Sequence, residues 1–285
     1  FTLFNNKKLR VLEKSKCKNC SCLYCYEKIL EGQSYLSELA GGKKKKESIF
    51  DPLKVFKDFR NYLGNAYLNF SEPIDLDSFL KEHVGDYSIS SPQEKPEWLQ
   101  QATSQLGQKV IKSINNSVAV TSTSLFSVAL LTSSTHAMSE EDMISRIKFF
   151  MTLISNSSDY KDVWFTQEDI QEIIAKTEKL GFISPTFVSS KKIYRPSADQ
   201  ISTLSFYKNN IAHLFILYSL ICESIKFVKK ASEEDVVNLL VMIYPIFAKD
   251  FHLKQSIAST ETVKVAMGVL KGRGVLNSDE EGNIG

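Results

Sequence analysis

Four cysteines lie within one short segment near the start of the chain, and closely spaced thiolates can bind zinc or an iron–sulfur centre. They are Cys17, Cys20, Cys22 and Cys25. Structural zinc sites usually join two Cys-x-x-Cys pairs from separated segments, whereas one short segment supplies four sulfurs only with a tightly curled backbone. We therefore favour a coincidental cluster, or non-native sequence, over a metal site.

Four histidines are the other side chains suited to general-base chemistry at neutral pH. None stands in a glycine-rich turn or a nucleophile elbow. His213 lies in an apolar run, which predicts a core histidine, and His136 precedes a helix start, which predicts a loop histidine. A Cys–His nucleophile pair would form only between segments brought together by the fold, and the sequence leaves it open.

Four consecutive lysines, Lys43, Lys44, Lys45 and Lys46, form the densest charge run in the chain. Such a run can attract a phosphate-bearing substrate or anionic lipid head groups, at about 1 kcal/mol per charge near a charged bilayer. Glu47 begins to compensate the charge. The simpler interpretation is a solvated loop, and we favour it.

The overall composition is that of a globular protein. The chain has 285 residues, 43% hydrophobic and 24% charged, with a net charge of +2. This length suits one large domain or two smaller ones, and the near-neutral charge does not call for a nucleic-acid partner. No apolar run reaches the roughly 18 residues of a membrane-spanning helix. The nearest, from Ile211 to Cys222, fits a buried or interfacial helix.

Three regions of the chain differ in composition. Residues 1–25 are basic and cysteine-rich without a clean period, which indicates non-native sequence or strong divergence. Residues 84–97 are rich in serine, glycine and proline and predict a linker. We therefore expect one part over residues 26–90 and a helical domain over 91–285, in an α+β fold that is mostly α. No internal repeat of fixed period is visible.

The hydrophobic pattern predicts the principal elements. Asp75 is the expected cap of a short helix from Leu76 to His83, and a hairpin is expected after Gly181. The other expected elements are helices over Tyr26–Leu39, Leu53–Leu63, Trp98–Asn115 and Thr121–Leu131, a strand over Ala66–Phe70, and a long apolar helix from about Ser205 to Val228.

Three further helix starts carry signatures like a capping box. Ser139, Thr166 and Ser232 are each followed by acidic residues that favour the positive end of a helix. We expect these helices to run through Ile154, Leu180 and Phe247. The signals are structural and predict no chemistry.

Three stretches in order carry a family resemblance. They read YEKILEGQSYLSELAGGKKKKES from Tyr26 to Ser48, GNAYLNFSEPIDLDSFL from Gly64 to Leu80, and FYKNNIAHLF from Phe206 to Phe215. Together they resemble the C-terminal half of the membrane-associated bacterial glycerol-3-phosphate acyltransferases. The resemblance covers residues 26–285 and implies the tail of an α/β acyltransferase domain, up to about residue 90, followed by a helical C-terminal domain truncated at its end.

The resemblance implies acyl transfer from acyl-CoA or acyl-carrier protein to the sn-1 hydroxyl of glycerol-3-phosphate, the first step of phospholipid synthesis. It implies no metal or organic cofactor, no nucleic acid, and a peripheral position on the cytoplasmic face of the inner membrane. Tyr26 and Glu27 resemble the end of a motif on the glycerol-phosphate side of the cleft, so both become candidate substrate-binding residues. A lysine-rich loop at Lys43–Lys46 also occurs in the family.

The catalytic motif of that family, HxxxxD, is missing from this sequence. In it the histidine removes the proton of the attacking hydroxyl and the aspartate orients the imidazole. Of the four histidines only His136 approaches the spacing, with Glu141 in place of aspartate, and it lies downstream of the Tyr26 block, against the family's order. We therefore assign no catalytic residue and expect a fragment that is inactive alone.

Two alternatives remain open. The stretches after residues 139 and 232 place capped helices ahead of a possible hairpin, as winged-helix domains do, which predicts a non-catalytic interaction module. Nucleic acid is a poor partner for it, because Lys176 and Lys179 on the relevant helix are balanced by Glu172 and Glu178. A family member acting on dihydroxyacetone phosphate is the second alternative.

Overall fold

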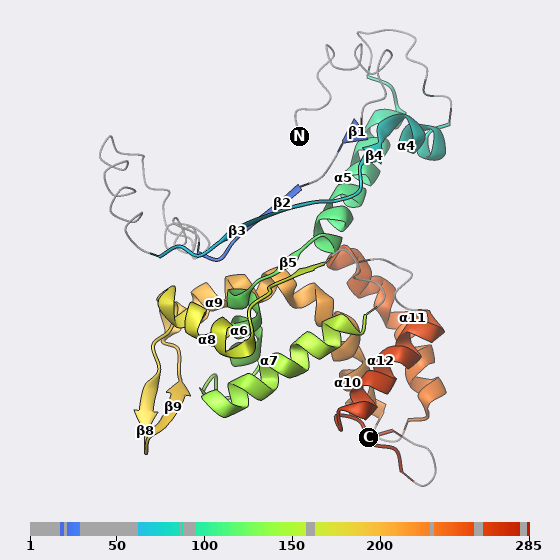
Figure 1. Ribbon diagram of the computed structural model, residues 1–285. Helices are drawn as coiled ribbons and strands as arrows, with labels where there is room; N and C mark the ends of the chain where they lie inside the picture. The colour runs from blue at the N-terminus through green and yellow to red at the C-terminus, as the bar shows by residue number, and fades with distance from the viewer. Residues whose placement is uncertain are drawn as a thin grey trace, which may run out of the picture.

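The computed structural model describes residues 18–19, 22–28, 62–85, 87, 95–157, 163–228, 231–253, 259–279 and 284–285. Within these ranges the chain is mostly helical with small sheets, which confirms the predicted α+β, mostly α, fold class. Figure 1 shows a helical body below an extended arm. The lysine run, residues 29–39 of the first predicted helix and nearly all of the predicted Leu53–Leu63 helix lie outside the described residues.

The arm has a small core of its own. Strand β1 (Lys18–Asn19) pairs with β4 (Ile74–Asp75), beside α4 (Leu76–His83) and α5 (Trp98–Asn116). Asp75 accepts a hydrogen bond from the Ser78 amide, which confirms the predicted cap. Helices α4 and α5 therefore share one core across the predicted linker, made of Ile74, Leu76, Phe79, Leu80, Ala102 and Leu106.

A two-stranded antiparallel ribbon connects the arm to the body. Strand β2 (Cys22–Tyr26) pairs with β3 (Ala66–Phe70) in a register that joins Tyr26 to Ala66. The strand predicted at Ala66–Phe70 is confirmed, whereas the helix start predicted at Tyr26 is wrong because Tyr26 ends β2. The ribbon packs on the body through Tyr67, whose ring lies 4.4 Å from that of Trp164.

Helix α6 (Ser122–Leu131) is the centre of the body, and all of its residues are buried. A helix apolar on every side must be surrounded by other elements. Helices α7 (Glu140–Ser155), α8 (Ile170–Lys179) and α9 (Ala198–Ala212) pack around it. A short parallel pair, β5 (Ala119–Val120) and β7 (Trp164–Phe165), closes the side that faces the ribbon.

In the described part of the body, two units share one arrangement of three helices followed by paired backbone segments. We call them winged-helix units because winged-helix domains have this arrangement. In the first unit α6, α7 and α8 are joined to a sheet of order β6–β9–β8, with β6 at Met138–Ser139, β8 at Thr186–Val188 and β9 at Lys191–Tyr194. In the second unit the helices are α10 (Ile216–Val228), α11 (Glu233–Asp250) and α12 (Thr260–Gly272). Bridges from Ile284 to Ala231 and to Ser278 reproduce the same strand order.

The two units follow one spacing along the chain. The cap residues Ser139 and Ser232 are separated by the same number of residues as Gly181 and Gly274, which both adopt a left-handed backbone after the third helix. The sequence showed no fixed period because few side chains are shared. The repeat is therefore one of structure, marked in sequence by the two Ser-Glu-Glu-Asp starts.

The long apolar helix of the sequence prediction spans Ala198–Val228 as α9, a 3-10 turn at His213–Phe215 and α10. It begins one to two turns earlier than predicted. It is long and apolar enough to cross a membrane, with a mean hydropathy of 1.7, but 61% of its most apolar window is buried inside the protein. Packing of α9 against α6 and of α10 against α11 and α12 accounts for its apolar composition.

Candidate functional site

The carboxylate of Glu27 is completely buried where the ribbon meets the body. Its Oε2 accepts a hydrogen bond from the Asn65 amide at 2.7 Å, and its Oε1 accepts one from the Tyr67 hydroxyl at 2.9 Å. The Lys176 ammonium lies 2.7 Å from the same Oε1. We call Glu27, Lys176 and Glu168 the ribbon anchor, because they join β2 to α8 and to the turn before α8.

The local backbone explains how Glu27 reaches this position. β2 ends at Tyr26, and the chain bends at Glu27 toward the body. Opposite it, Gly64 has φ +71, and a Cβ at Gly64 would lie 2.4 Å from Glu27 Oε2. Only glycine adopts this conformation readily and leaves the carboxylate room. The ribbon anchor therefore depends on Gly64 as well as on its charged members.

Lys176 binds a second carboxylate. Its ammonium forms a very short contact with Glu168, which also accepts a hydrogen bond from the Ser122 hydroxyl at 2.9 Å. Burial opposes the charge on Lys176, but hydrogen bonds to Glu168 and Glu27 outweigh it and raise the pKa of Lys176. Burial likewise opposes the charge on Glu168, yet Lys176 and Ser122 lower its pKa. The lysine thus stays charged between two carboxylates.

The residues next to Glu27 have different surroundings. The Tyr26 ring is 49% exposed. Lys28 donates to the carbonyl of Leu180 at 2.6 Å, where the negative end of α8 favours a cation. Glu27 and Lys28 both bind the body, so the structure gives Glu27 protein partners. Substrate binding by Tyr26 and Glu27 stays a prediction.

The remaining predicted site residues are only partly described. Lys43, Lys44, Lys45, Lys46, Cys17 and Cys20 lie outside the described residues, and Cys22 belongs to β2. Cys25 is buried, and burial together with the nearby Glu27 charge raises the pKa of its thiol to about 11. Among the described residues no three His, Cys, Asp or Glu side chains are grouped to hold a metal ion.

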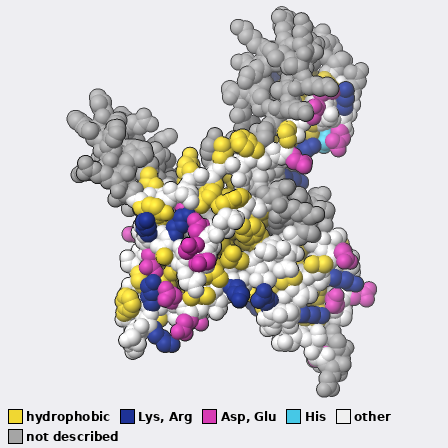
Figure 2. All heavy atoms as spheres, viewed as in Figure 1, with side chains coloured by type: hydrophobic (Ala, Val, Ile, Leu, Met, Phe, Trp, Pro, Cys, Tyr) yellow, Lys and Arg dark blue, Asp and Glu magenta, His cyan; other side chains and the backbone are white. Residues whose placement is uncertain are grey.

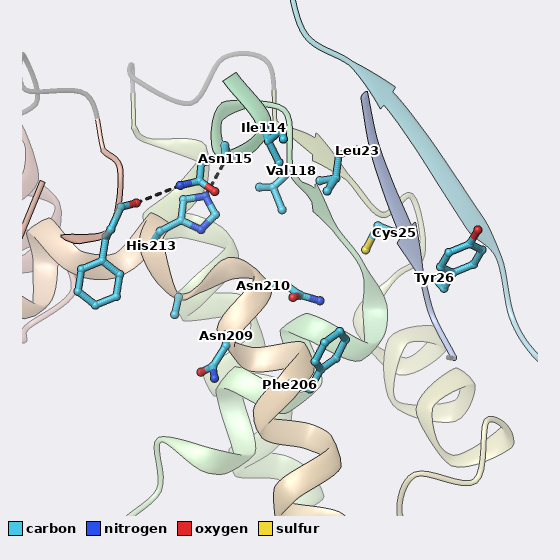
Figure 3. A pocket seen from close by; sticks show the side chains of 12 residues that line it. Leu23, Cys25, Tyr26, Ile114, Asn115, Val118, Phe206, Asn209, Asn210 and His213 are labelled. Atoms are coloured by element: carbon cyan, nitrogen blue, oxygen red, sulfur yellow. Dashed lines mark hydrogen bonds between the residues drawn. The ribbon is translucent and has the colours of Figure 1, made fainter. Parts of the chain in front are cut away.

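A cleft of about 620 Å³ opens beside the ribbon. Figure 3 shows it between β2, the end of α5 and helix α9. His213 is buried on one wall, which confirms the predicted core histidine, and its Nε2 lies 3.0 Å from the Asn115 carbonyl oxygen. Burial lowers the pKa of His213 against the opposing effect of that hydrogen bond. His136 lies in the turn before β6, as predicted.

Sequence reasoning missed Lys176, Glu168 and the cleft. Lys176 stood in a mixed-charge helix that looked solvated, and its partner Glu27 lies far away in sequence. Glu168 precedes α8 and Lys176 lies inside it, a spacing that gives only a weak local signal of their contact. The cleft is built from four segments that are distant in sequence, and no residue pattern in any one of them predicts it.

Comparisons with known proteins identify the family. Residues 35–284 match the model of the glycerol-3-phosphate acyltransferase C-terminal region. A glycerol-3-phosphate acyltransferase of Alteromonas mediterranea is 32% identical over 90% of the chain. One from Pseudoalteromonas translucida is 30% identical over 81% of the chain, and one from Pseudomonas fluorescens is 28% identical over 84%.

The family model covers most of the chain, including the helical body to which the strand ribbon is anchored, and this match defines the class of protein. The chain belongs to the glycerol-3-phosphate acyltransferase family and corresponds to its C-terminal region. It spans 29–32% of the length of these relatives, about a third. The family predicted from the three sequence stretches is thereby confirmed.

Proposed function

We propose that the chain is the C-terminal region of a glycerol-3-phosphate 1-O-acyltransferase, which transfers an acyl group from acyl-CoA or acyl-carrier protein to sn-glycerol-3-phosphate in phospholipid synthesis. The match over residues 35–284 carries this proposal. HxxxxD is absent from the 285 residues, so the general base has to come from another part of the enzyme. The chain alone is expected to be inactive. The reaction needs no metal or organic cofactor.

The ribbon anchor supports a specific role for this region. Glu27 and Lys28 fix the end of β2 to α8, and Tyr26 at that strand end remains exposed. An active site requires its strands to be held in place by surrounding residues. The helical body would thus set the position of the strand that carries the two candidate substrate-binding residues.

A chimera tests the proposal. In the Alteromonas mediterranea relative, the matching segment is replaced by this chain, and transfer of labelled palmitate from palmitoyl-CoA to glycerol-3-phosphate is measured. We expect activity in the chimera and none in the chain alone or in the relative without the segment. A folded chimera with no activity would contradict the proposal.

A peripheral position on the cytoplasmic face of the inner membrane belongs to the same proposal. The outer side of α11 exposes Val241, Met242 and Ile246, at 48%, 74% and 63%. An apolar helix side of this kind can enter a bilayer interface. Flotation with phosphatidylglycerol vesicles should weaken when Met242 and Ile246 are both replaced by glutamate, and unchanged flotation would argue against this surface.

A second candidate function, a non-catalytic interaction module, is favoured by the two winged-helix units. A protein partner fits this module better than nucleic acid. Lys176, the buried cation of α8, is already paired with Glu27 and Glu168, and the face of the body in Figure 2 mixes both signs of charge. An electrophoretic shift of duplex DNA by the purified chain at moderate salt would revive the nucleic-acid alternative.

A further inference from the structure

Among the described residues, the cleft beside β2 is lined by uncharged side chains. Its walls include Leu23, Ile114, Val118 and Phe206, and no Asp, Glu, Lys or Arg within the described ranges lines it. Its volume of about 620 Å³ falls in the range of small-molecule sites, about 300–1,000 Å³. A charged group placed there would lose its hydration without finding a partner. The part of a ligand inside the cleft is therefore expected to be uncharged and largely apolar, with any charged head group left in solvent.

The polar groups around the cleft indicate which polar group a ligand could carry. His213 Nε2 is hydrogen-bonded to the Asn115 carbonyl oxygen, and Asn115 Nδ2 donates to the Phe251 carbonyl oxygen at 3.0 Å. Figure 3 shows the Asn210 amide on the α9 side, facing the gap toward Cys25. A neutral amide donor in a largely apolar cleft suits a ligand with a neutral acceptor, such as a carbonyl group.

We propose that this cleft binds a fatty acyl chain, with the Asn210 amide donating to the carbonyl oxygen of its ester or thioester. The inference rests on the proposed acyl transfer, which supplies such a chain in both the acyl donor and the lysophospholipid product. Strand β2 lines the cleft and also carries Tyr26. The chain would therefore lie beside the candidate substrate-binding residues.

Binding is measured on the purified chain by displacement of the fluorescent fatty acid cis-parinaric acid, with saturated fatty acids from octanoate to stearate below their micelle concentrations. Each added methylene should tighten binding about fourfold until the cleft is filled. Ala212 lines the cleft, and Ala212→Phe should weaken palmitate binding by about tenfold or more. Ala198→Phe, at an exposed position of the same helix, is the matched control.

Cys25 provides a second measurement that does not depend on a variant. Its buried thiol lines the cleft, whereas Cys222 does not. Palmitate should slow alkylation of Cys25 by N-ethylmaleimide, followed by peptide mass spectrometry, and leave Cys222 unchanged. Binding of palmitoyl-CoA is compared with that of CoA, and binding of palmitoyl-lysophosphatidate with that of glycerol-3-phosphate. These comparisons show whether the acyl donor or the product binds more tightly, and tighter binding of either acylated compound supports acyl-chain binding in the cleft.

Equal palmitate binding by Ala212→Phe and Ala198→Phe, or no dependence on chain length, would overturn the proposal. So would equal protection of Cys25 and Cys222. None of these measurements uses acyl transfer. The proposal of acyl-chain binding can therefore be wrong while the chimera is active. Conversely, an inactive chimera would not change the binding result.

Discussion

The two winged-helix units have the same architecture but use their third helices differently. In the first unit α8 presents Lys176 to the ribbon, and the ammonium lies 2.7 Å from Glu27. At the corresponding spacing in α12 stands Val269, which packs against the core. The shared arrangement of helices is thus separable from the binding surface, which comes from a few residues placed on it.

The ion pairs between the second and third helices also differ between the two units. The third helix is tied to the start of the second helix in both units, through Lys192 between Glu178 and Glu140 in the first. In the second unit Lys271 pairs directly with Glu233. Glu178 and Lys271 occupy corresponding positions with opposite charge. An ion-pair link between the second and third helices is thus present in both units, although different residues form it. The contact with the ribbon is made by the first unit.

The largest effect is expected from Lys176→Met. The substitution leaves the buried Glu27 and the partly exposed Glu168 without their cation. Removing one partner of a buried pair such as Glu27–Lys176 costs about 3–5 kcal/mol. Hydrogen exchange of the β2 and β3 amides should accelerate strongly, and urea should unfold the chain earlier. Val269→Met at the corresponding position is the control; it enlarges a partly buried side chain and should cost about 1–3 kcal/mol, less than Lys176→Met. Equal losses would mean that Lys176 has no special role.

Two glycines give the next comparison. Gly64 and Gly274 both have a left-handed backbone, at φ +71 and φ +69, but a Cβ meets Glu27 at Gly64 and open space at Gly274. Gly274→Ala should cost about 1–2 kcal/mol from backbone strain alone. Gly64→Ala adds displacement of the Glu27 carboxylate and should cost clearly more in urea unfolding. A smaller loss at Gly64 would show that the anchor tolerates movement.

Local signals in the sequence were sufficient for most helices. Ser139 and Ser232 cap α7 and α11 as predicted, because a cap depends only on the next few residues. The cap predicted at Thr166 is wrong: Asp169 is the N-cap of α8, with Glu172 completing a capping box. Thr166 competes poorly because the full box at Asp169 satisfies two backbone amides.

Long-range pairing was beyond local signals. Residues 22–26 form a strand because they pair with Ala66–Phe70, and nothing in their own pattern indicates that partner. The same holds for Glu27 and Lys176, which meet only when the ribbon docks on α8. The charges on α8 were visible in sequence, but not which of them is buried.

The ties between second and third helices predict a smaller difference. Lys271 and Glu233 are 34% and 39% exposed, so solvent screens their pair, and Lys271→Met should cost about 0.2–1 kcal/mol. Lys192 is 26% exposed and joins two carboxylates, so Lys192→Met should cost more. Urea unfolding of both variants measures the difference. A greater loss with Lys271→Met would contradict this ranking.

The smallest effect concerns the pH dependence of the ribbon. Burial raises the pKa of Tyr67 to about 12, with the hydrogen bond to Glu27 adding to it against an opposing one from Asn65. A pKa raised above the ordinary value of 10.0 stabilises the folded protein below pH 10, and this contribution is lost as the pH rises toward 12. Tyr67→Phe should therefore flatten the fall in stability across this window, measured by urea unfolding at stepped pH. Tyr26, which is exposed at the end of β2, gives the control Tyr26→Phe, and this variant should leave the fall unchanged. An equal flattening in both variants would contradict the assignment of this pH dependence to Tyr67.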